Sequence, residues 1–173
     1  MDEVTLLDDA AVPIGTLPKH EVHTTDTPLH LAFSCHLLDA DGRILLTRRA
    51  LSKQTWPGVW TNSFCGHPRP GEAMLDAVHR RAADELGVRV SQVRTVLPDY
   101  RYRAVDASGI VENEICPVHL AVLEGPMDPR PEEVSEWAWA SPDDIVQAVQ
   151  STPFVFSPWM REQIGLLRSL GAI

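Results

Sequence analysis

A change in hydrophobic periodicity along the chain limits what it can fold into. Over residues 29–37, apolar and other side chains alternate, which predicts a half-buried β-strand. Residues 41–42, Asp-Gly, predict a turn into a second strand at residues 43–49, so the two strands form a hairpin. From residue 74 to 86 the apolar residues recur at helical spacing, and Gly87 is suited to end that helix. The chain therefore combines locally paired strands with a helix.

The rest of the chain continues this mixture. Residues 50–60 have the composition of a loop, and both Ser141-Pro142 and Ser157-Pro158 read as an N-cap followed by the first helical residue. Further strands are predicted at residues 93–97, 100–105, 110–122 and 136–140. Antiparallel hairpins, one internal helix and closing helices indicate an α+β fold.

The length and the net charge of the chain limit its number of domains and its kinds of partner. With 173 residues and 44% hydrophobic residues, the chain is expected to form one domain over residues 1–173, without a disulfide or structural metal. A net charge of −9 argues against a nucleic-acid or anionic-membrane partner, but allows a small anion in a locally basic pocket. The three cysteines form no Cys-x-x-Cys pair, and an acidic N-terminus and the lack of a long apolar run predict a cytoplasmic protein.

The predicted helix carries a degenerate phosphate motif. The spacing from Gly66 through Glu72 to Glu85 resembles the Nudix box, a loop–helix–loop whose carboxylates hold divalent metal against a diphosphate. Arg81 and Asp84 stand where Nudix hydrolases carry Glu. Because Arg81 and Glu85 are four residues apart, they share a helix face, either as an exposed ion pair or in a phosphate and metal site.

Histidines and carboxylates suggest a metal centre. His23 and His30 flank a polar TTDTP segment, so a chain reversal could bring both imidazoles together with His67, although a single histidine is more often structural. Glu112 and Glu114 share one face of a strand within an apolar run, where a cation or a proton must neutralise them. A solvated strand face is the alternative. Three imidazoles and carboxylate oxygens would suit Mn²⁺, Mg²⁺ or Zn²⁺.

Cationic and aromatic residues complete the set of candidates. Each cation taken alone is ordinary surface charge, but together they could form an anion pocket: Lys19, Arg49, Lys53 and Arg81. Trp159 is either a core residue or a ring face for a cation, and Tyr102 either fills a strand or donates its hydroxyl near the carboxylates.

Five separated segments, in order between about residues 4 and 160, resemble type I isopentenyl-diphosphate isomerase: TLPKHEVHTTDTPLHLAFS, TRRALSKQTWPGVWTNSFCGHP, DYRYRA, GIVENEICPV and FSPWM. The resemblance implies a Nudix-like fold and the conversion of isopentenyl to dimethylallyl diphosphate. It implies protonation and deprotonation on opposite faces of the substrate, through a carbocation.

The resemblance also implies roles for individual residues. The ligands of a protein-held Mn²⁺, Mg²⁺ or Zn²⁺ would be His23, His30, His67, Glu112 and Glu114. A second Mg²⁺ would bind Glu85 and the backbone carbonyl of Cys65. The catalytic residues would be Cys65, Glu114 and Tyr102. The substrate would meet Lys19, Arg49, Lys53 and Arg81 at its diphosphate and Trp159 at its hydrocarbon.

Two other functions compete with this interpretation. A Nudix diphosphate hydrolase explains the box but gives Cys65 and Tyr102 no role, and Arg81 counts against it. A catalytically silent module could bind a nucleotide or RNA on the same fold, which the net charge of −9 disfavours. We expect a monomeric enzyme that acts on a small diphosphate, with no nucleic-acid or membrane partner.

Overall fold

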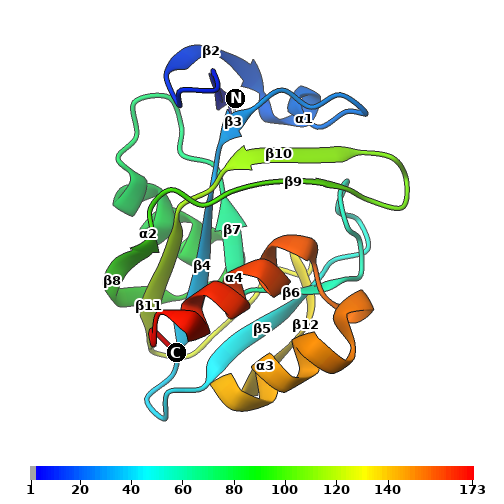
Figure 1. Ribbon diagram of the computed structural model, residues 1–173. Coiled ribbons are helices and arrows are strands. Elements are labelled where there is room, and N and C mark those ends of the chain that lie inside the picture. Colours follow the sequence, from blue (N-terminus) through cyan, green and yellow to red (C-terminus); the bar gives the residue numbers. More distant parts are fainter. Residues whose placement is uncertain (1–2) are drawn as a thin grey trace.

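The computed structural model describes residues 3–173, which fold into two mixed β-sheets with helices against the larger one (Figure 1). The smaller sheet has the order β2-β1-β3-β10-β9, with bounds Pro13–Pro18, Glu3–Leu7, His30–Leu31, Val111–Ile115 and Arg101–Val105. The larger sheet has the order β12-β5-β4-β11-β8, with bounds Val134–Ala140, Ile44–Arg49, Phe33–Leu38, Val118–Glu124 and Arg89–Leu97. Two short strands extend it, β6 (Trp60–Thr61) on β5 and β7 (Phe64–Gly66) on β4.

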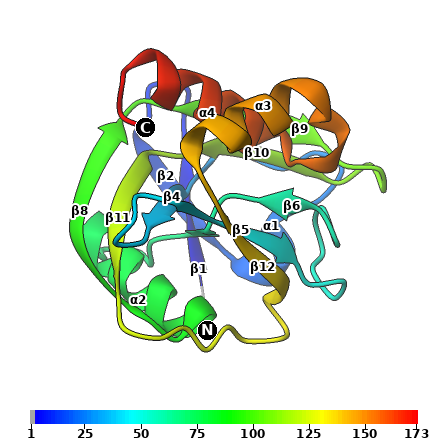
Figure 2. The ribbon, with the colours of Figure 1, turned by 90° about the horizontal axis from the view of Figure 1, so that it is seen from below.

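The helices are α1 (Lys19–Val22), α2 (Met74–Leu86), α3 (Pro142–Ser151) and α4 (Pro158–Ser169), with a 3₁₀ turn at Pro153–Val155. Figure 2 shows α2 on one side of the larger sheet and α3 and α4 on the other. Within the described part of the chain, no helix has the length and apolar character needed to cross a membrane.

Two parallel strand pairs join the sheets. β3 and β10 pair in the smaller sheet, and their continuations β4 and β11 pair in the larger one. The change of sheet occurs at Ala32, whose N–H donates to the Ile115 carbonyl at 2.9 Å, and beside it at Pro117, whose carbonyl accepts from Ser34 N at 3.1 Å. The prediction of one strand over residues 110–122 is therefore wrong in its middle, because proline has no N–H to continue a ladder.

β4 is buried on both faces, so the prediction that residues 29–37 form a half-buried strand is also wrong. Phe33, Cys35 and Leu37 pack in the core that includes the buried side chains of α2. On the opposite face, Ser34 and His36 are fully buried beneath α4 and hydrogen-bond to it. A strand with α2 on one side and α4 on the other has no exposed face, even where its alternate residues are polar.

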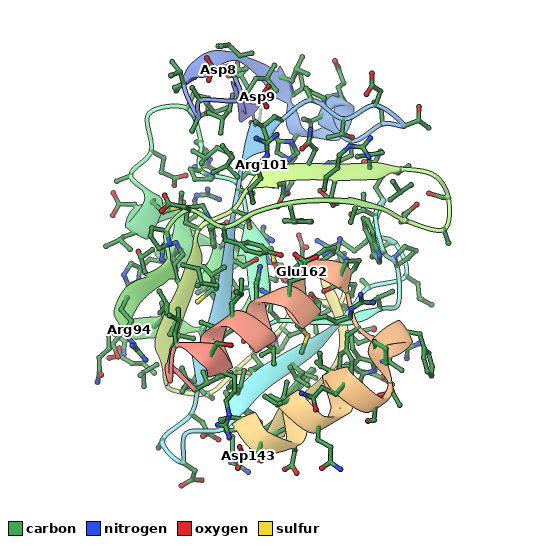
Figure 3. All side chains as sticks on the ribbon, in the orientation of Figure 1. Asp8, Asp9, Arg94, Arg101, Asp143 and Glu162 are labelled. Carbon is green, nitrogen blue, oxygen red and sulfur yellow. The ribbon has the colours of Figure 1, made fainter. Side chains whose placement is uncertain are left out.

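Other predicted elements are confirmed. β4 and β5 form the antiparallel hairpin, and α2 ends at Gly87 in the left-handed conformation, with φ of 66°. Ser141 caps α3 by accepting from Asp144 N at 3.2 Å. Ser157 occupies the N-cap position of α4, but its hydroxyl meets Thr61 Oγ1 at 2.8 Å and makes no capping bond. The smaller sheet extends beyond the predicted strands, and an ion pair of 3.1 Å between Arg101 and Asp9 links β9 to the N-terminal hairpin (Figure 3).

Candidate active site

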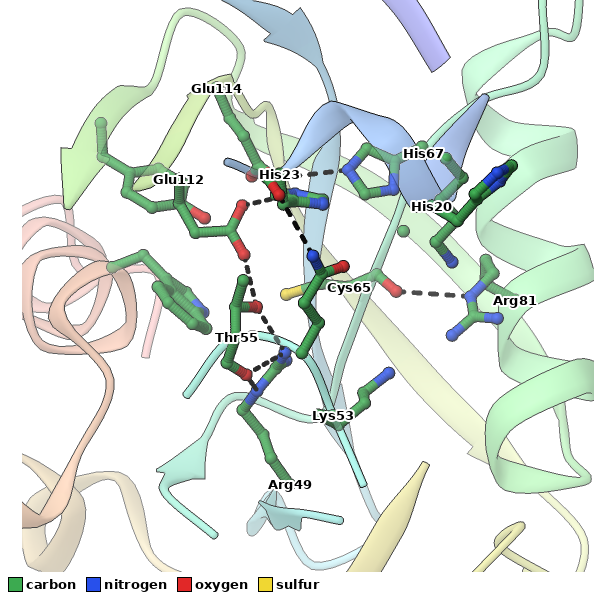
Figure 4. A pocket seen from close by; sticks show the side chains of 15 residues that line it. His20, His23, Arg49, Lys53, Thr55, Cys65, His67, Arg81, Glu112 and Glu114 are labelled. Carbon is green, nitrogen blue, oxygen red and sulfur yellow. Dashed lines mark hydrogen bonds and ion pairs between the residues drawn. The ribbon is translucent and has the colours of Figure 1, made fainter. Parts of the chain in front are cut away.

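A cavity of about 380 Å³ lies where the two sheets meet (Figure 4). β9 and β10 form one wall, and β5, β7 and the loop after β5 form another. All the site residues expected from the sequence line this cavity except His30 and Glu85, which are buried next to residues that do. The fold thus gathers side chains from residue 19 to residue 159 into one space.

Three histidines and Glu114 form a compact cluster, and all of them except His30 line the cavity. One ligand atom from each of them lies within 4.8 Å of all the others. The register of the parallel pair β3–β10 sets Glu114 directly beside His30. The TTDTP segment reverses the chain, with Thr27 Oγ1 accepting from Thr24 N at 2.9 Å, and the imidazole rings of His23 and His30 lie 5.2 Å apart.

The donor atoms of this cluster fit a divalent cation. His23 Nε2 and Glu112 Oε2 approach to 2.9 Å, yet neither has a hydrogen-bond partner among the described residues. His30 Nδ1 lies 2.9 Å from the Pro28 carbonyl, a bond that needs the proton on Nδ1 and leaves the Nε2 lone pair facing the cluster. Buried nitrogen and oxygen atoms that converge without hydrogen bonds are expected of metal ligands. Glu112 lies beside the four clustered residues through its contact with His23.

The charges of the cluster also suit a metal. Burial lowers the pKa of His67 to about 3, against the opposing effect of Glu114, so this imidazole is neutral at pH 7. Burial lowers the pKa of His30, but the neighbouring Glu114 carboxylate outweighs it and raises that pKa. Burial raises the pKa of Glu114, but its contacts with the two imidazoles outweigh it and bring the pKa well below the usual range. A neutral imidazole and an ionised carboxylate are the forms that bind metal.

Cys65 and Glu114 line the same cavity. Burial raises the pKa of the Cys65 thiol to about 11, while hydrogen bonds from Ser34 and Asn62 act against this shift. The Glu114 charge raises that pKa further. Tyr102 stands opposite Glu114 in the β9–β10 ladder, and burial keeps its pKa well above the usual value. The cavity therefore holds three groups that can carry a proton.

The four expected cations line the same cavity. Lys53 contacts Glu133, and Arg81 contacts both Glu85 and, at 3.5 Å, Glu133. Arg81 is 9% and Glu85 6% exposed, so the interpretation of this pair as an exposed surface ion pair is wrong. Arg81 Nε also donates to the Cys65 carbonyl at 3.4 Å, which brings the Glu85 carboxylate and that carbonyl to the same guanidinium.

Comparisons with known proteins agree with this geometry. The NUDIX domain matches residues 28–160. An isopentenyl-diphosphate Delta-isomerase of Clavibacter sepedonicus is 64% identical over 164 residues, which are 95% of this chain and 86% of the relative. One from Paenarthrobacter aurescens is 56% identical over 170 residues, or 98% of this chain and 92% of the relative.

The chain belongs to the isopentenyl-diphosphate isomerase family.

Solved structures support the fold. A Deinococcus radiodurans protein superposes with a TM-score of 0.72 at 16% identity, covering 94% of this chain and 97% of that one. A MutT protein of Methanosarcina mazei superposes with a TM-score of 0.64, also at 16% identity, covering 83% and 96%. At such identities the likeness shows a Nudix-like fold alone, and it confirms the α+β fold expected from the sequence.

In this member of the isomerase family, the charged residues of the Nudix box have two uses. Some hold the loop before α2 in place, and others face the site. Glu72, at the box's first carboxylate position, holds Arg80 through two contacts of 2.7 Å and accepts from Arg69 N at 2.7 Å. These bonds fix the loop before α2, and Glu72 does not line the cavity. Arg81 and Glu85 lie on the other side of α2, at the site.

Aromatic rings close the cavity on the side of α4. Trp159 is 2% exposed, with ring centroids 5.5 Å from Tyr102 and 5.3 Å from Trp56. The Arg49 guanidinium lies 5.7 Å from the Trp159 ring centroid. A π-face is thus presented to the same space as the proton-carrying groups.

Several residues of this isomerase-family site were not expected from the sequence. Thr55 Oγ1 donates to Glu112 Oε1 at 2.7 Å, and Glu133 contacts two of the cations. Behind Cys65 lie Asn62, Ser34 and Gln163. No pattern in a single sequence distinguishes these residues from ordinary polar positions, since their roles arise from contacts between distant segments.

Proposed function

We propose that this protein interconverts isopentenyl diphosphate and dimethylallyl diphosphate in isoprenoid biosynthesis. The observation that carries the proposal is one cavity lined by a thiol, a carboxyl group, a phenol and four cations, with a cluster of metal-ligand atoms beside them. Family membership and this arrangement support the same chemistry.

The diphosphate would bind where the cations line the cavity. Its oxygens would meet the cations Lys19, Arg49, Lys53 and Arg81. The Glu85 carboxylate and the Cys65 carbonyl would hold a Mg²⁺ ion, which would supply further positive charge for the diphosphate. Binding energy gained at this end of the substrate can position the reacting carbons.

The cluster of histidines and glutamates would hold a second divalent cation. Its ligands would be His23, His30, His67, Glu112 and Glu114. When bound, Mn²⁺, Mg²⁺ or Zn²⁺ would fix the Glu114 carboxyl in place and lower its pKa. The metal is proposed from the donor set, and its identity is open to direct measurement.

Two groups would move the double bond. Glu114, assisted by the Tyr102 hydroxyl, would give a proton to the terminal alkene carbon, which leaves a tertiary carbocation. Cys65 would then take a proton from the carbon next to the diphosphate-bearing one, and that C–H electron pair would become the new double bond. Placement of each acid or base contributes about 10²–10⁴-fold. Transfer on opposite faces of the substrate requires no large movement of it.

The proton balance fits a reversible reaction. In the ligand-free site the thiol is protonated and Glu114 is ionised, as the direction of each pKa shift requires. That is the state left behind after dimethylallyl diphosphate forms, because Glu114 has then given a proton and Cys65 has taken one. One proton returned from the thiol to the carboxyl group would restore the starting state.

The cavity wall would protect the carbocation. Trp159 presents a buried ring beside Tyr102, and an aromatic face stabilises a desolvated cation by about 2 kcal/mol. Exclusion of water matters because water would trap the cation as an alcohol.

The decisive experiment follows isopentenyl diphosphate with the purified protein in D₂O by NMR, with and without chelator. We expect dimethylallyl diphosphate carrying deuterium, loss of turnover on chelation, and recovery with Mn²⁺ or Mg²⁺. Full activity of the metal-depleted protein would contradict the five-ligand site. Release of phosphate without isomerisation would favour a hydrolase, and tight RNA binding without turnover would favour a binding module.

Quaternary state, location and partners are proposed from the sequence alone. A monomeric state, a cytoplasmic location, and the lack of nucleic-acid and membrane partners stay predictions from the sequence. Gel filtration with light scattering measures the first of these directly.

A further inference from the structure

Two fully buried side chains approach the Cys65 sulfur from behind the cavity wall. Asn62 Nδ2 donates to Cys65 Sγ at 3.2 Å, and Ser34 Oγ lies 3.4 Å from the same atom. Neither Asn62 nor Ser34 is exposed to solvent, and neither lines the cavity. They therefore meet the sulfur on the side away from the substrate.

Trp159 fixes the orientation of the Asn62 amide. An indole N–H can only donate, and Trp159 Nε1 lies 2.9 Å from Asn62 Oδ1. The amide nitrogen must then face three acceptors with its two hydrogens: the Phe64 carbonyl at 2.8 Å, the Cys35 carbonyl at 3.1 Å and the Cys65 sulfur at 3.2 Å. Because Cys65 Sγ also lies 3.4 Å from Oδ1, the amide can accept from the thiol and donate to the thiolate. It suits a sulfur that gains and loses a proton.

Gln163 orients the Ser34 hydroxyl in the same manner. Burial lowers the pKa of His36 to about 4, so its imidazole is neutral and carries one proton. His36 Nε2 lies 3.0 Å from Gln163 Oε1, while Nδ1 is buried and has no hydrogen-bond partner within residues 3–173. A proton on Nε2 leaves only a lone pair unpartnered, which costs less than a buried orphan N–H. The Gln163 nitrogen then donates to Ser34 Oγ at 3.0 Å.

Both chains of hydrogen bonds end at the Cys65 sulfur. Since Ser34 Oγ accepts from Gln163, its own proton is available to a neighbouring sulfur. Cys65 and Cys116 both lie 3.4 Å from this oxygen, and of the two only Cys65 lines the cavity. The residues that orient the donors, Trp159 and Gln163, stand four apart on one face of α4.

We propose that Asn62 and Gln163 are positioning residues for the reaction, with Asn62 acting directly on the Cys65 sulfur and Gln163 acting through Ser34. Together they hold the sulfur at the cavity wall while it exchanges a proton with the substrate. The proposal rests on the proposed function, in which Cys65 removes that proton. The packing of α4 against the sheet would then fix both the Trp159 ring at the cavity and the position of the Cys65 sulfur.

The test is a double-mutant cycle of Ser34→Ala and Gln163→Leu in the full-length enzyme loaded with Mn²⁺ or Mg²⁺. Each single change should lower kcat by about 10- to 100-fold, the range for a hydrogen bond to a charged group, and leave KM for isopentenyl diphosphate within about twofold. Adding Gln163→Leu to Ser34→Ala should lower kcat no further, because Gln163 acts through the hydroxyl. Additive losses would overturn that route.

A kinetic isotope effect separates positioning from simple destabilisation. With substrate deuterated at the carbon that loses its proton, the isotope effect on kcat should rise in both variants, because that step becomes slower. Asn62→Asp keeps the oxygen for Trp159 but replaces the N–H that faces the sulfur, and should show the same rise. If Gln163→Leu does not fold, Gln163→Met and the Ser34 and Asn62 variants still decide the matter.

Ser63→Ala is the matched control. Ser63 is a fully buried serine whose hydroxyl contacts only the backbone of Leu37 and Leu45, each at 2.7 Å. It should lose stability with kcat and isotope effect unchanged.

Cys65→Ala separates the two proposals. An active Cys65→Ala enzyme would refute the proposed function, whereas an inactive one, with Ser34→Ala and Gln163→Leu at wild-type kcat and isotope effect, would overturn this inference alone.

Discussion

Thr55 ties the two ends of the active site together. Its hydroxyl donates to Glu112 Oε1 at 2.7 Å and accepts from Arg49 Nη2 at 3.1 Å. Thr55 therefore orients a carboxylate of the proposed metal cluster and a cation of the proposed diphosphate site. Partners of this kind hold a metal ligand in its binding geometry.

Thr55→Val keeps the side-chain shape and removes both hydrogen bonds. We expect the affinity for Mn²⁺ to fall by about 10- to 100-fold, because Glu112 loses the bond that orients it. Calorimetric titration of the metal-free protein measures this affinity. Ser52→Ala, an exposed change on the same loop whose hydroxyl meets only the Glu132 carbonyl at 3.3 Å, is the control. Equal affinities in the two variants would show that Thr55 does not support the site.

Glu114→Gln tests the proposed acid. The variant retains the size of the side chain and should still bind diphosphate, because the cations are untouched. It should transfer no deuterium from D₂O into the substrate, since the amide has no acidic proton to give. NMR of the product measures label uptake, and wild-type uptake would reject the acid role of Glu114.

The sequence predicted the residues whose chemistry is distinctive and missed those whose role comes from contact. The histidines beside TTDTP and the Glu-x-Glu pair attract attention because such residues are unusual in apolar segments. Thr55 and Gln163 are ordinary residue types, and their partners lie 57 and 129 positions away in the chain. Only the fold shows those pairings.

The end of α2 shows how one residue sets the path of an element. Gly87 has φ of 66°, and a Cβ there would lie 2.7 Å from the Asp128 carbonyl oxygen. Gly71 has a similar φ of 78°, but a Cβ there would meet nothing within 4 Å. A substitution at Gly71 therefore tests backbone strain alone, whereas one at Gly87 adds a steric conflict.

Gly87→Ala should lower the free energy of unfolding by about 2–4 kcal/mol, and Gly71→Ala by only about 1 kcal/mol. The smaller loss reflects the left-handed backbone alone, and the excess at Gly87 reflects displacement of the Asp128 segment. Urea unfolding of both variants measures the difference. Equal losses would mean that the Asp128 segment moves aside without resistance.

Elements with a strong period were predictable, and those set by tertiary contact were not. The helix at residues 74–86 and the hairpin after residue 38 follow from local pattern. β1 and β2 bury only Val4 and Leu7, which is too little apolar alternation to predict a strand. The break at Pro117 required knowing that its neighbours belong to two different sheets.

At the scale of the whole molecule, an acidic chain gathers several of its cations in one place. The chain carries −9, yet four cations from residues 19 to 81 meet at one cavity. Composition allows such a pocket but cannot place it, because its members come from a helix, a strand, a loop and a second helix. That residues 1–173 form one domain stays a prediction.

The larger sheet contains two buried histidines on adjacent strands, His36 of β4 and His119 of β11. Burial lowers the pKa of each to about 4. In the unfolded chain a histidine titrates near 6.5, so between pH 6.5 and 4 the unfolded state binds more protons than the folded state. The free energy of unfolding must therefore fall as the pH falls through this range, by up to about 3 kcal/mol for each residue.

His36→Gln tests this source of acid sensitivity. The variant should be less stable than wild type near neutral pH, since the bond to Gln163 is altered, but its stability should decline less between pH 6.5 and 4.5. The reason is that the unfolded variant has one fewer histidine to protonate. Urea unfolding across this range, with chelator present so that metal binding adds no pH dependence, measures the two slopes. His79→Gln, an exposed change on α2, is the control. If the free energy of unfolding of wild type and of His36→Gln fell in parallel with pH, protonation of His36 would not drive acid unfolding.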